Sequence, residues 1–126
     1  MGTSQGSIAA MNAAAHARRQ TIAGVVLTES VSVPGKSTET VFDADPSDVE
    51  VAALVVSNRR DACRVAPPWM AARIAKSMKH AHVDLIYEDG GVQNSSNVCG
   101  SMSPHGYWGM DERVIDDIER WMNQVA

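Results

Sequence analysis

Three short apolar runs mark the strands that the hydrophobic pattern predicts. Residues 22–28 and 51–56 are apolar at nearly every position, as in strands of parallel sheets that are buried on both faces. Residues 83–87 form a third run with Asp84 in its middle, so we expect this strand at an edge of the sheet. The segment 29–50 is polar and rich in Ser, Thr, Asp and Pro, which predicts a loop with at most one short helical turn.

Helices are predicted between and after these strands. The alanine-rich residues 7–17 favour a helix, and because they are apolar on nearly all sides we expect it to be buried. Residues 67–79 carry apolar side chains at helical spacing behind two prolines, and residues 110–125 predict a strongly amphipathic helix. Both Trp69 and Trp121 are expected in the core. The order of elements predicts an α/β fold, with a parallel sheet of about three strands flanked by helices.

Length and charge narrow the function classes. A chain of 126 residues is long enough for a single domain with its own core. The net charge is −4 and the basic residues are scattered, which argues against a nucleic-acid surface and favours a small-molecule partner. No apolar run reaches the length that spans a membrane, and the first residues do not have the order of a secretory signal. We therefore expect no membrane partner.

One histidine is presented by a glycine-rich loop at residues 99–109. Pro104 restricts the backbone before His105, and Gly106 and Gly109 allow sharp turns after it. We expect the imidazole to be exposed and fixed close to the start of the last helix. Histidine titrates near neutral pH, so this arrangement suits a general base. An ordinary surface histidine is the alternative unless a nucleophile and a carboxylate lie nearby.

A candidate nucleophile lies at the front of the chain, in the pentapeptide Gly2-Thr3-Ser4-Gln5-Gly6. It fits G-x-S-x-G, the nucleophile elbow, in which a serine projects from a strained turn between a strand and a helix. The helix that follows is predicted, but only Met1 stands where the preceding strand is required. The alternative is that Ser4 simply caps the N-terminus of the helix.

A candidate carboxylate accompanies the candidate nucleophile and the candidate general base. In parallel α/β sheets, ligand-binding and catalytic residues lie at the carboxyl ends of the strands. Ser4 precedes the first helix, Asp61 follows the second predicted strand and His105 follows the third, so we expect all three at one edge of the sheet. Two alternatives remain open at this point. Asp61 could pair with neighbouring arginines as a solvated loop residue, and Glu29, which follows the first predicted strand, is a rival for the orienting role.

Together these features resemble the C-terminal half of an α/β-hydrolase. The similarity rests on the elbow around Ser4, the strand 51–56 that leads to Asp61, and the histidine loop before a final helix, and it covers nearly the whole chain. It implies that Ser4 is the nucleophile, His105 the general base and Asp61 the carboxylate that orients the imidazole. The backbone N–H of Gln5 would be an oxyanion-hole donor. The implied reaction is hydrolysis of an ester or amide through an acyl-enzyme, with no cofactor and no metal.

The chain also departs from this family. There the elbow follows the fifth strand of an eight-stranded sheet, so we expect residues 1–126 to be an incomplete domain that lacks the N-terminal half and its second oxyanion donor. Activity of this chain alone is then expected to be impaired. The strand at 22–28 would become an unprotected edge. The alternative function is a non-catalytic, truncated hydrolase-like domain that requires a partner or a homo-oligomer to cover this edge.

The resemblance also bears on the two cysteines. Cys63 lies two residues beyond the proposed acid and Cys99 six residues before the proposed base, so convergence of these loops would allow a disulfide between them. Such a disulfide would suggest an exported parent protein. The alternatives are two separate thiols in a reducing compartment, or a metal site built by the cysteines with His80 and His82.

Overall fold

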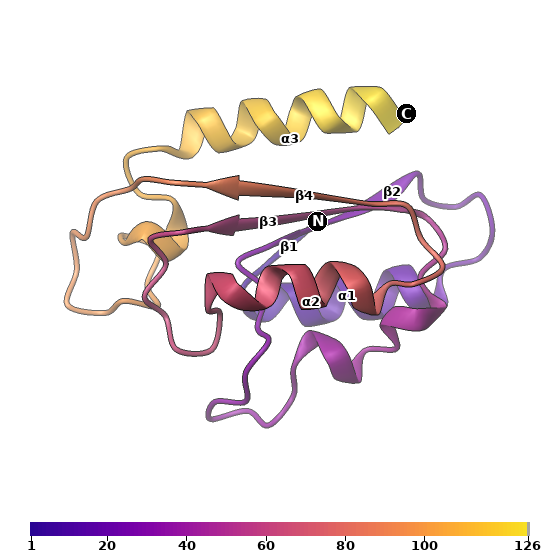
Figure 1. Ribbon diagram of the computed structural model, residues 1–126, viewed down its shortest axis with the longest axis horizontal. Coiled ribbons are helices and arrows are strands. Elements are labelled where there is room, and N and C mark those ends of the chain that lie inside the picture. The colour runs from indigo at the N-terminus through magenta and orange to yellow at the C-terminus, as the bar shows by residue number, and fades with distance from the viewer. Residues whose placement is uncertain (126) are drawn as a thin grey trace.

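The computed structural model describes residues 1–125 and contains a four-stranded parallel sheet. The strands are β1 (Gly2–Thr3), β2 (Gly24–Thr28), β3 (Ala52–Asn58) and β4 (Val83–Glu88), and they lie side by side in sequence order (Figure 1). The predicted α/β class with a parallel sheet flanked by helices is therefore confirmed. The sheet has four strands where about three were expected.

The additional strand is β1, which the hydrophobic pattern did not predict. Its two residues pair with the end of β2, Gly2 beside Leu27 and Thr3 beside Thr28. A two-residue segment carries no periodicity, so only its hydrogen bonds to β2 make it a strand. The expectation that the strand at 22–28 forms an unprotected edge was wrong at its carboxyl end, because β1 pairs with Leu27 and Thr28 there. Ile22 itself lies before β2 and is 38% exposed.

The helices cover both faces of the sheet. On one face lie α1 (Gln5–His16) and α2 (Ala71–Ser77), and on the other lies α3 (Asp111–Val125) (Figure 1). Each face has its own hydrophobic core. The first includes Met11, Leu27, Val55 and Ile74, and the second includes Leu54, Val56, Ile118 and Trp121. Alternate residues of β3 therefore enter different cores, as expected for a strand buried on both faces.

The first helix is less buried than its composition predicts. Only Ser7, Met11 and Ala14 of α1 are buried, and they lie on the face that packs against the sheet. Alanine favours a helix through its backbone propensity, which does not depend on burial. The prediction of a buried helix was wrong for most of α1, because one face of the helix packs on the sheet and the opposite face of the helix is directed outward.

The last helix has the amphipathic pattern that the sequence predicts. Val114, Ile118 and Trp121 are buried, and their spacing places them on one face of α3. The Trp121 indole N–H donates to a carboxylate oxygen of Asp84 at 2.8 Å. This bond accounts for the charge in the middle of β4, which is an edge strand as predicted.

Several connections contain single turns of 3₁₀ helix. They span Val41–Asp43, Pro46–Asp48, Pro68–Met70 and Pro104–Gly106. In the third of these turns Met70 is buried and Trp69 is 69% exposed, so the prediction of a core position for Trp69 was wrong. The tight turn directs Met70 inward and leaves Trp69 on the outer side.

The strand register aligns the carboxyl ends of the strands. Thr3 lies beside Thr28, Thr28 beside Val56, and Val56 beside Ile86. The segments that follow β1, β2, β3 and β4 therefore leave the sheet at one edge, where the arrowheads of β3 and β4 point in Figure 1. Loops far apart in the sequence meet at this edge.

Candidate functional site

Ser4 occupies a strained turn between β1 and α1. Its backbone has φ 55° and ψ −121°, a conformation that residues with a side chain rarely adopt. The turn is tight enough that a Cβ on Gly2 would lie 2.1 Å from the carbonyl oxygen of Gly6, so position 2 requires glycine. The Ser4 side chain makes no capping hydrogen bond to α1. The alternative of a simple helix cap is therefore wrong, and the hydroxyl is directed elsewhere.

The Ser4 hydroxyl meets the imidazole of His105. The distance from Ser4 Oγ to His105 Nε2 is 2.9 Å, although 101 positions separate the two residues in the sequence. The histidine belongs to the 3₁₀ turn Pro104–Gly106, where a Cβ on Gly106 would clash with the Ser101 carbonyl oxygen. The histidine is buried, with only 3% of its surface exposed. The expectation of an exposed histidine was wrong.

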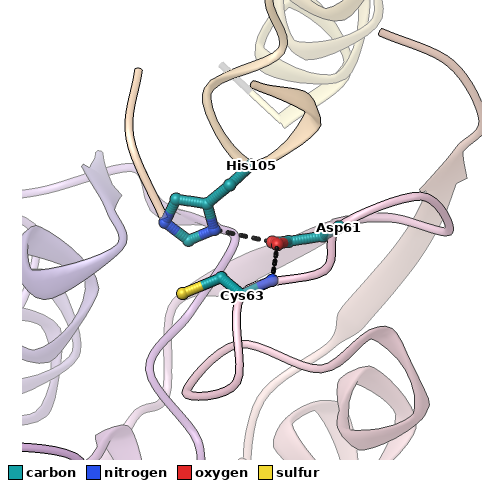
Figure 2. A group of neighbouring side chains, drawn as sticks. All are labelled: Asp61, Cys63 and His105. Carbon is teal, nitrogen blue, oxygen red and sulfur yellow. Dashed lines mark hydrogen bonds and ion pairs between the residues drawn. The ribbon is translucent and has the colours of Figure 1, made fainter. Parts of the chain in front are cut away.

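The other imidazole nitrogen meets Asp61. His105 Nδ1 lies 2.7 Å from Asp61 Oδ2, and the Cys63 backbone N–H donates to Asp61 Oδ1 at 2.8 Å. Figure 2 shows the carboxylate between these two groups. With the proton on Nδ1, His105 donates to Asp61 and accepts from the Ser4 hydroxyl at Nε2. Ser4, His105 and Asp61 thus form one continuous hydrogen-bonded chain.

Asp61 does not pair with the neighbouring arginines. Arg60 Nε instead contacts Asp89 Oδ1 at 2.8 Å, and the Arg59 guanidinium lies over the ring of Tyr87. The Asp61 carboxylate is fully buried, out of reach of solvent. The alternative of a solvated loop carboxylate is therefore wrong for this residue.

Asn58 connects the loop of Asp61 with the loop of His105. Its side-chain N–H groups donate to the carbonyl oxygens of Gly90 and Pro104 at 3.0 and 2.9 Å, and its side-chain oxygen accepts from the Arg60 N–H. Asn58 is completely buried. Asn58 lies just after the predicted strand 51–56, but the sequence carried no signal for this bridging role, because its partners lie in two separate segments, one after β3 and one after β4.

A disulfide joins the same two loops. Cys63 and Cys99 are bonded to each other, 36 positions apart in the sequence. The sequence left open a disulfide, two separate thiols or a metal site, and the structure contains the disulfide. The bond connects the residue that donates to Asp61 with the segment that leads to His105.

The structure provides no shared metal site for the cysteines and histidines considered from the sequence. His80 Nδ1 contacts the Ser47 carbonyl oxygen, and His82 lies near Asp84. The side chains of Asp61, Cys63 and His105 do converge (Figure 2), but the Cys63 sulfur is bonded to Cys99 and cannot act as a thiolate ligand. We therefore assign no metal to this cluster.

Gln5 is the first residue of α1. The first N–H groups of a helix have no carbonyl partner within it and favour negative charge nearby. The backbone N–H of Gln5 follows Ser4 directly, which suits it to stabilise an anion formed at the serine. Gln5 also lines an open hollow of about 470 Å³, and Gly106 and Trp108 line another of about 620 Å³. Gln5 follows Ser4 and Gly106 follows His105 in the sequence, so each hollow is lined by a chain neighbour of one of these two residues.

Glu29, the rival for the orienting role, lies close to Asp61 but does not contact His105. It follows β2 directly, is 1% exposed, and one of its oxygens, Oε1, accepts from the Asn58 backbone N–H. Burial and the neighbouring Asp61 carboxylate raise the pKa of Glu29 from 4.5 to about 10. Glu29 is therefore neutral at pH 7, and Asp61 is the carboxyl group that meets the imidazole.

The raised pKa of Glu29 predicts that Glu29→Gln increases the free energy of unfolding, and that this increase grows as the pH rises. At pH values well below 4.5 the carboxyl is neutral in the folded and the unfolded chain, so the shift has no effect on stability. Between pH 4.5 and about 10 only the unfolded chain ionises, so wild-type stability falls as the pH rises. By about pH 7 the wild type should have lost about 3 kcal/mol that the variant keeps. Urea unfolding of both proteins at about pH 4 and pH 7 measures this difference.

Glu39→Gln is the matched control, because Glu39 is exposed. Its free energy of unfolding should follow that of the wild type across the same pH range. If the curve for Glu29→Gln also runs parallel to that of the wild type, Glu29 is ionised in the folded protein.

Two further findings concern membrane-spanning helices and similarity to known proteins. Within residues 1–125, no helix combines the length and the apolar character needed to cross a membrane. Compared with known proteins, the chain matches no family model, no curated protein and no solved structure.

Proposed function

We propose that this chain is a serine hydrolase that cleaves ester or amide bonds by acyl transfer. The observation that carries the proposal is the hydrogen-bonded chain from Ser4 through His105 to Asp61, with contacts of 2.9 and 2.7 Å. A serine on a strained turn, an imidazole on its hydroxyl and a buried carboxylate on the far nitrogen are the parts of a Ser-His-Asp triad. We further propose kinship with the α/β-hydrolases, supported by the order Ser, Asp, His along a parallel sheet.

In the first half of the proposed reaction, Ser4 Oγ attacks the carbonyl carbon of the substrate while His105 Nε2 takes the hydroxyl proton. Asp61 accepts from Nδ1 and stabilises the imidazolium that forms. The negative charge on the carbonyl oxygen faces the Gln5 N–H. The intermediate then collapses, His105 passes its proton to the leaving alcohol or amine, and the acyl group remains on Ser4.

In the second half, water attacks the acyl carbon while His105 Nε2 takes a proton from it. The second intermediate collapses, His105 returns a proton to Ser4 Oγ, and the carboxylic acid leaves. No step requires a cofactor. Among residues 1–125 we identify one oxyanion donor, Gln5. Because one donor of this kind contributes about 10²–10³ in kcat, we expect slow turnover unless a second donor is supplied.

The test is labelling with a fluorophosphonate, which forms a bond to an activated serine. We expect the folded protein to be labelled on the peptide that contains Ser4, and Ser4→Ala to remain unlabelled. Mass spectrometry of the digested protein measures the site. Ser96→Ala, a change at an exposed loop serine, is the matched control and should be labelled like the wild type. A folded wild-type protein that is not labelled contradicts the proposal.

A second candidate is a non-catalytic domain that docks with a partner or with another copy of itself. It is favoured by apolar side chains near the start of β2, where Met1 and Met122 are exposed beside Ile22. These residues line a hollow of about 440 Å³ together with Trp121. Since β1 pairs only with Leu27 and Thr28, the earlier part of β2 offers an edge for docking. An unlabelled protein that sediments as an oligomer would favour this candidate.

A further inference from the structure

A second carboxyl group lies beside the proposed triad and takes no part in the mechanism above. Glu29 is buried at the carboxyl end of β2, and its backbone φ of 43° falls in the region that favours glycine. Strained backbone of this kind is concentrated at functional sites. The Glu29 side chain points into the same buried space as Asp61 and Tyr107, which are its close neighbours.

We propose that Glu29 is a positioning residue, a neutral carboxylic acid that donates its proton to the Asp61 carboxylate and so holds Asp61 against His105. This inference rests on the proposed function for its catalytic meaning. The location of the proton, however, is a property of the folded chain and can be measured separately.

The number of hydrogen-bond donors indicates which carboxyl holds the proton. Two carboxylates that share a buried site cannot both be ionised at modest cost, so one of them keeps a proton. Asp61 receives two donors, His105 Nδ1 and the Cys63 N–H. Glu29 receives one close donor, the Asn58 N–H at Oε1. Donors stabilise the anion, so Asp61 is the ionised member and Glu29 the neutral one.

The unpartnered oxygen of Glu29 is the place for this proton. Oε2 is buried and has no hydrogen-bond partner within residues 1–125. An O–H group there is shielded from water, and Asp61 is the neighbouring carboxylate that can accept from it. The terminal torsion of a glutamate side chain is broad, so a small adjustment brings the O–H to Asp61 while Oε1 stays near Asn58.

Tyr107 completes the surroundings of Glu29. Its hydroxyl is buried without a partner within residues 1–125, and burial together with Glu29 raises the pKa of Tyr107 far above its ordinary value. Tyr107 therefore stays protonated and is a neutral neighbour of Glu29. The titratable groups that face Glu29 are thus Asp61 and Tyr107, and Glu88 lies near Tyr107. None of these neighbours is a cation that would draw the proton away from Glu29.

The first experiment locates the proton by carbon NMR of protein labelled at the glutamate carboxyl carbon, with Glu29→Gln to assign the signal. We expect Glu29 to show the shift of a neutral acid at pH 7. A carboxylate shift at pH 7 overturns the proposal. This measurement does not depend on activity, so it decides the state of Glu29 even if the fluorophosphonate fails to label Ser4.

The second experiment separates donation from mere packing. In Glu29→Gln an amide N–H can replace the carboxylic O–H, whereas Glu29→Leu keeps the volume and has no donor. We expect fluorophosphonate labelling of Glu29→Gln at close to the wild-type rate, and at least about tenfold slower labelling of Glu29→Leu. Glu88→Gln, a change in another buried carboxyl, should not slow labelling. Equal losses in the Gln and Leu variants overturn the donor role.

The imidazole N–H proton of His105 gives a readout in the folded protein that does not need a reaction. Its proton NMR signal reports the bond from Nδ1 to Asp61. We expect the signal to be retained in Glu29→Gln and to move or disappear in Glu29→Leu, even if Glu29→Leu is less stable but still folded by circular dichroism. An unchanged signal in the folded Leu variant would show that Glu29 does not position Asp61.

Discussion

His105→Ala is expected to slow fluorophosphonate labelling of Ser4 by about 10³–10⁴-fold, the upper part of the range for loss of a general base. The imidazole is the hydrogen-bond partner of Ser4 Oγ in the structure, at 2.9 Å. Without it the hydroxyl keeps its proton and is a weak nucleophile at neutral pH. The second-order labelling rate constant, measured over a range of probe concentrations, gives this loss directly.

His82→Ala is the control, because the His82 side chain is exposed and lies near Asp84, away from Ser4. It should leave the labelling rate within about twofold of the wild type, as most changes at the surface do. Circular dichroism of His105→Ala checks that the fold is retained. If folded His105→Ala is labelled as fast as the wild type, Ser4 is not activated by this histidine and the proposed mechanism is wrong.

Removal of the disulfide is expected to lower the free energy of unfolding by about 4 kcal/mol, from the loss of entropy that closing a loop of this size imposes on the unfolded chain. Cys63 and Cys99 are 36 positions apart, so the bond closes a long loop. Urea unfolding of the Cys63→Ser, Cys99→Ser double variant measures the change.

The same variant should also label more slowly. Cys63 donates its backbone N–H to Asp61, and Cys99 begins the segment that ends at His105, so the bond holds both loops in register. Wild-type protein treated with a reductant is the comparison, since it lacks the bond but keeps both sulfur atoms. A double variant that unfolds at the same urea concentration as the untreated wild type would show that other contacts, such as those of Asn58, suffice.

Both predictions concern residues that follow the predicted strands, so the hydrophobic pattern indicated their positions approximately. The strands around residues 24–28, 52–58 and 83–88 were predicted because continuous apolar runs are a local property of the sequence. The strand before Ser4 was not predicted, because Gly2 and Thr3 have no pattern of their own and become a strand only beside β2. The elbow therefore lacked one of its required elements until the sheet was known.

The choice between Asp61 and Glu29 shows a second limit. Both carboxyl groups follow a strand, so their positions in the sequence do not distinguish their roles. The structure distinguishes them by hydrogen bonds, since the His105 ring contacts Asp61, while Glu29 accepts from Asn58. Asn58 is the last residue of β3 and His105 lies in the 3₁₀ turn after β4, and the sequence does not show which carboxyl group each of them meets.

By itself, the sequence determined the class of fold and the order in which a serine, an aspartate and a histidine follow the strands of a parallel sheet. Hydrophobic periodicity and secondary-structure propensity depend on residues that are close together in the sequence, so they can be recognised from the sequence alone. Only the tertiary structure decided that His105 is buried, that Asn58 bridges two loops, and that the buried Glu29 lies beside Asp61. These features depend on atoms brought together across as many as 101 positions, where distance and burial set the hydrogen bonds and the place of the proton.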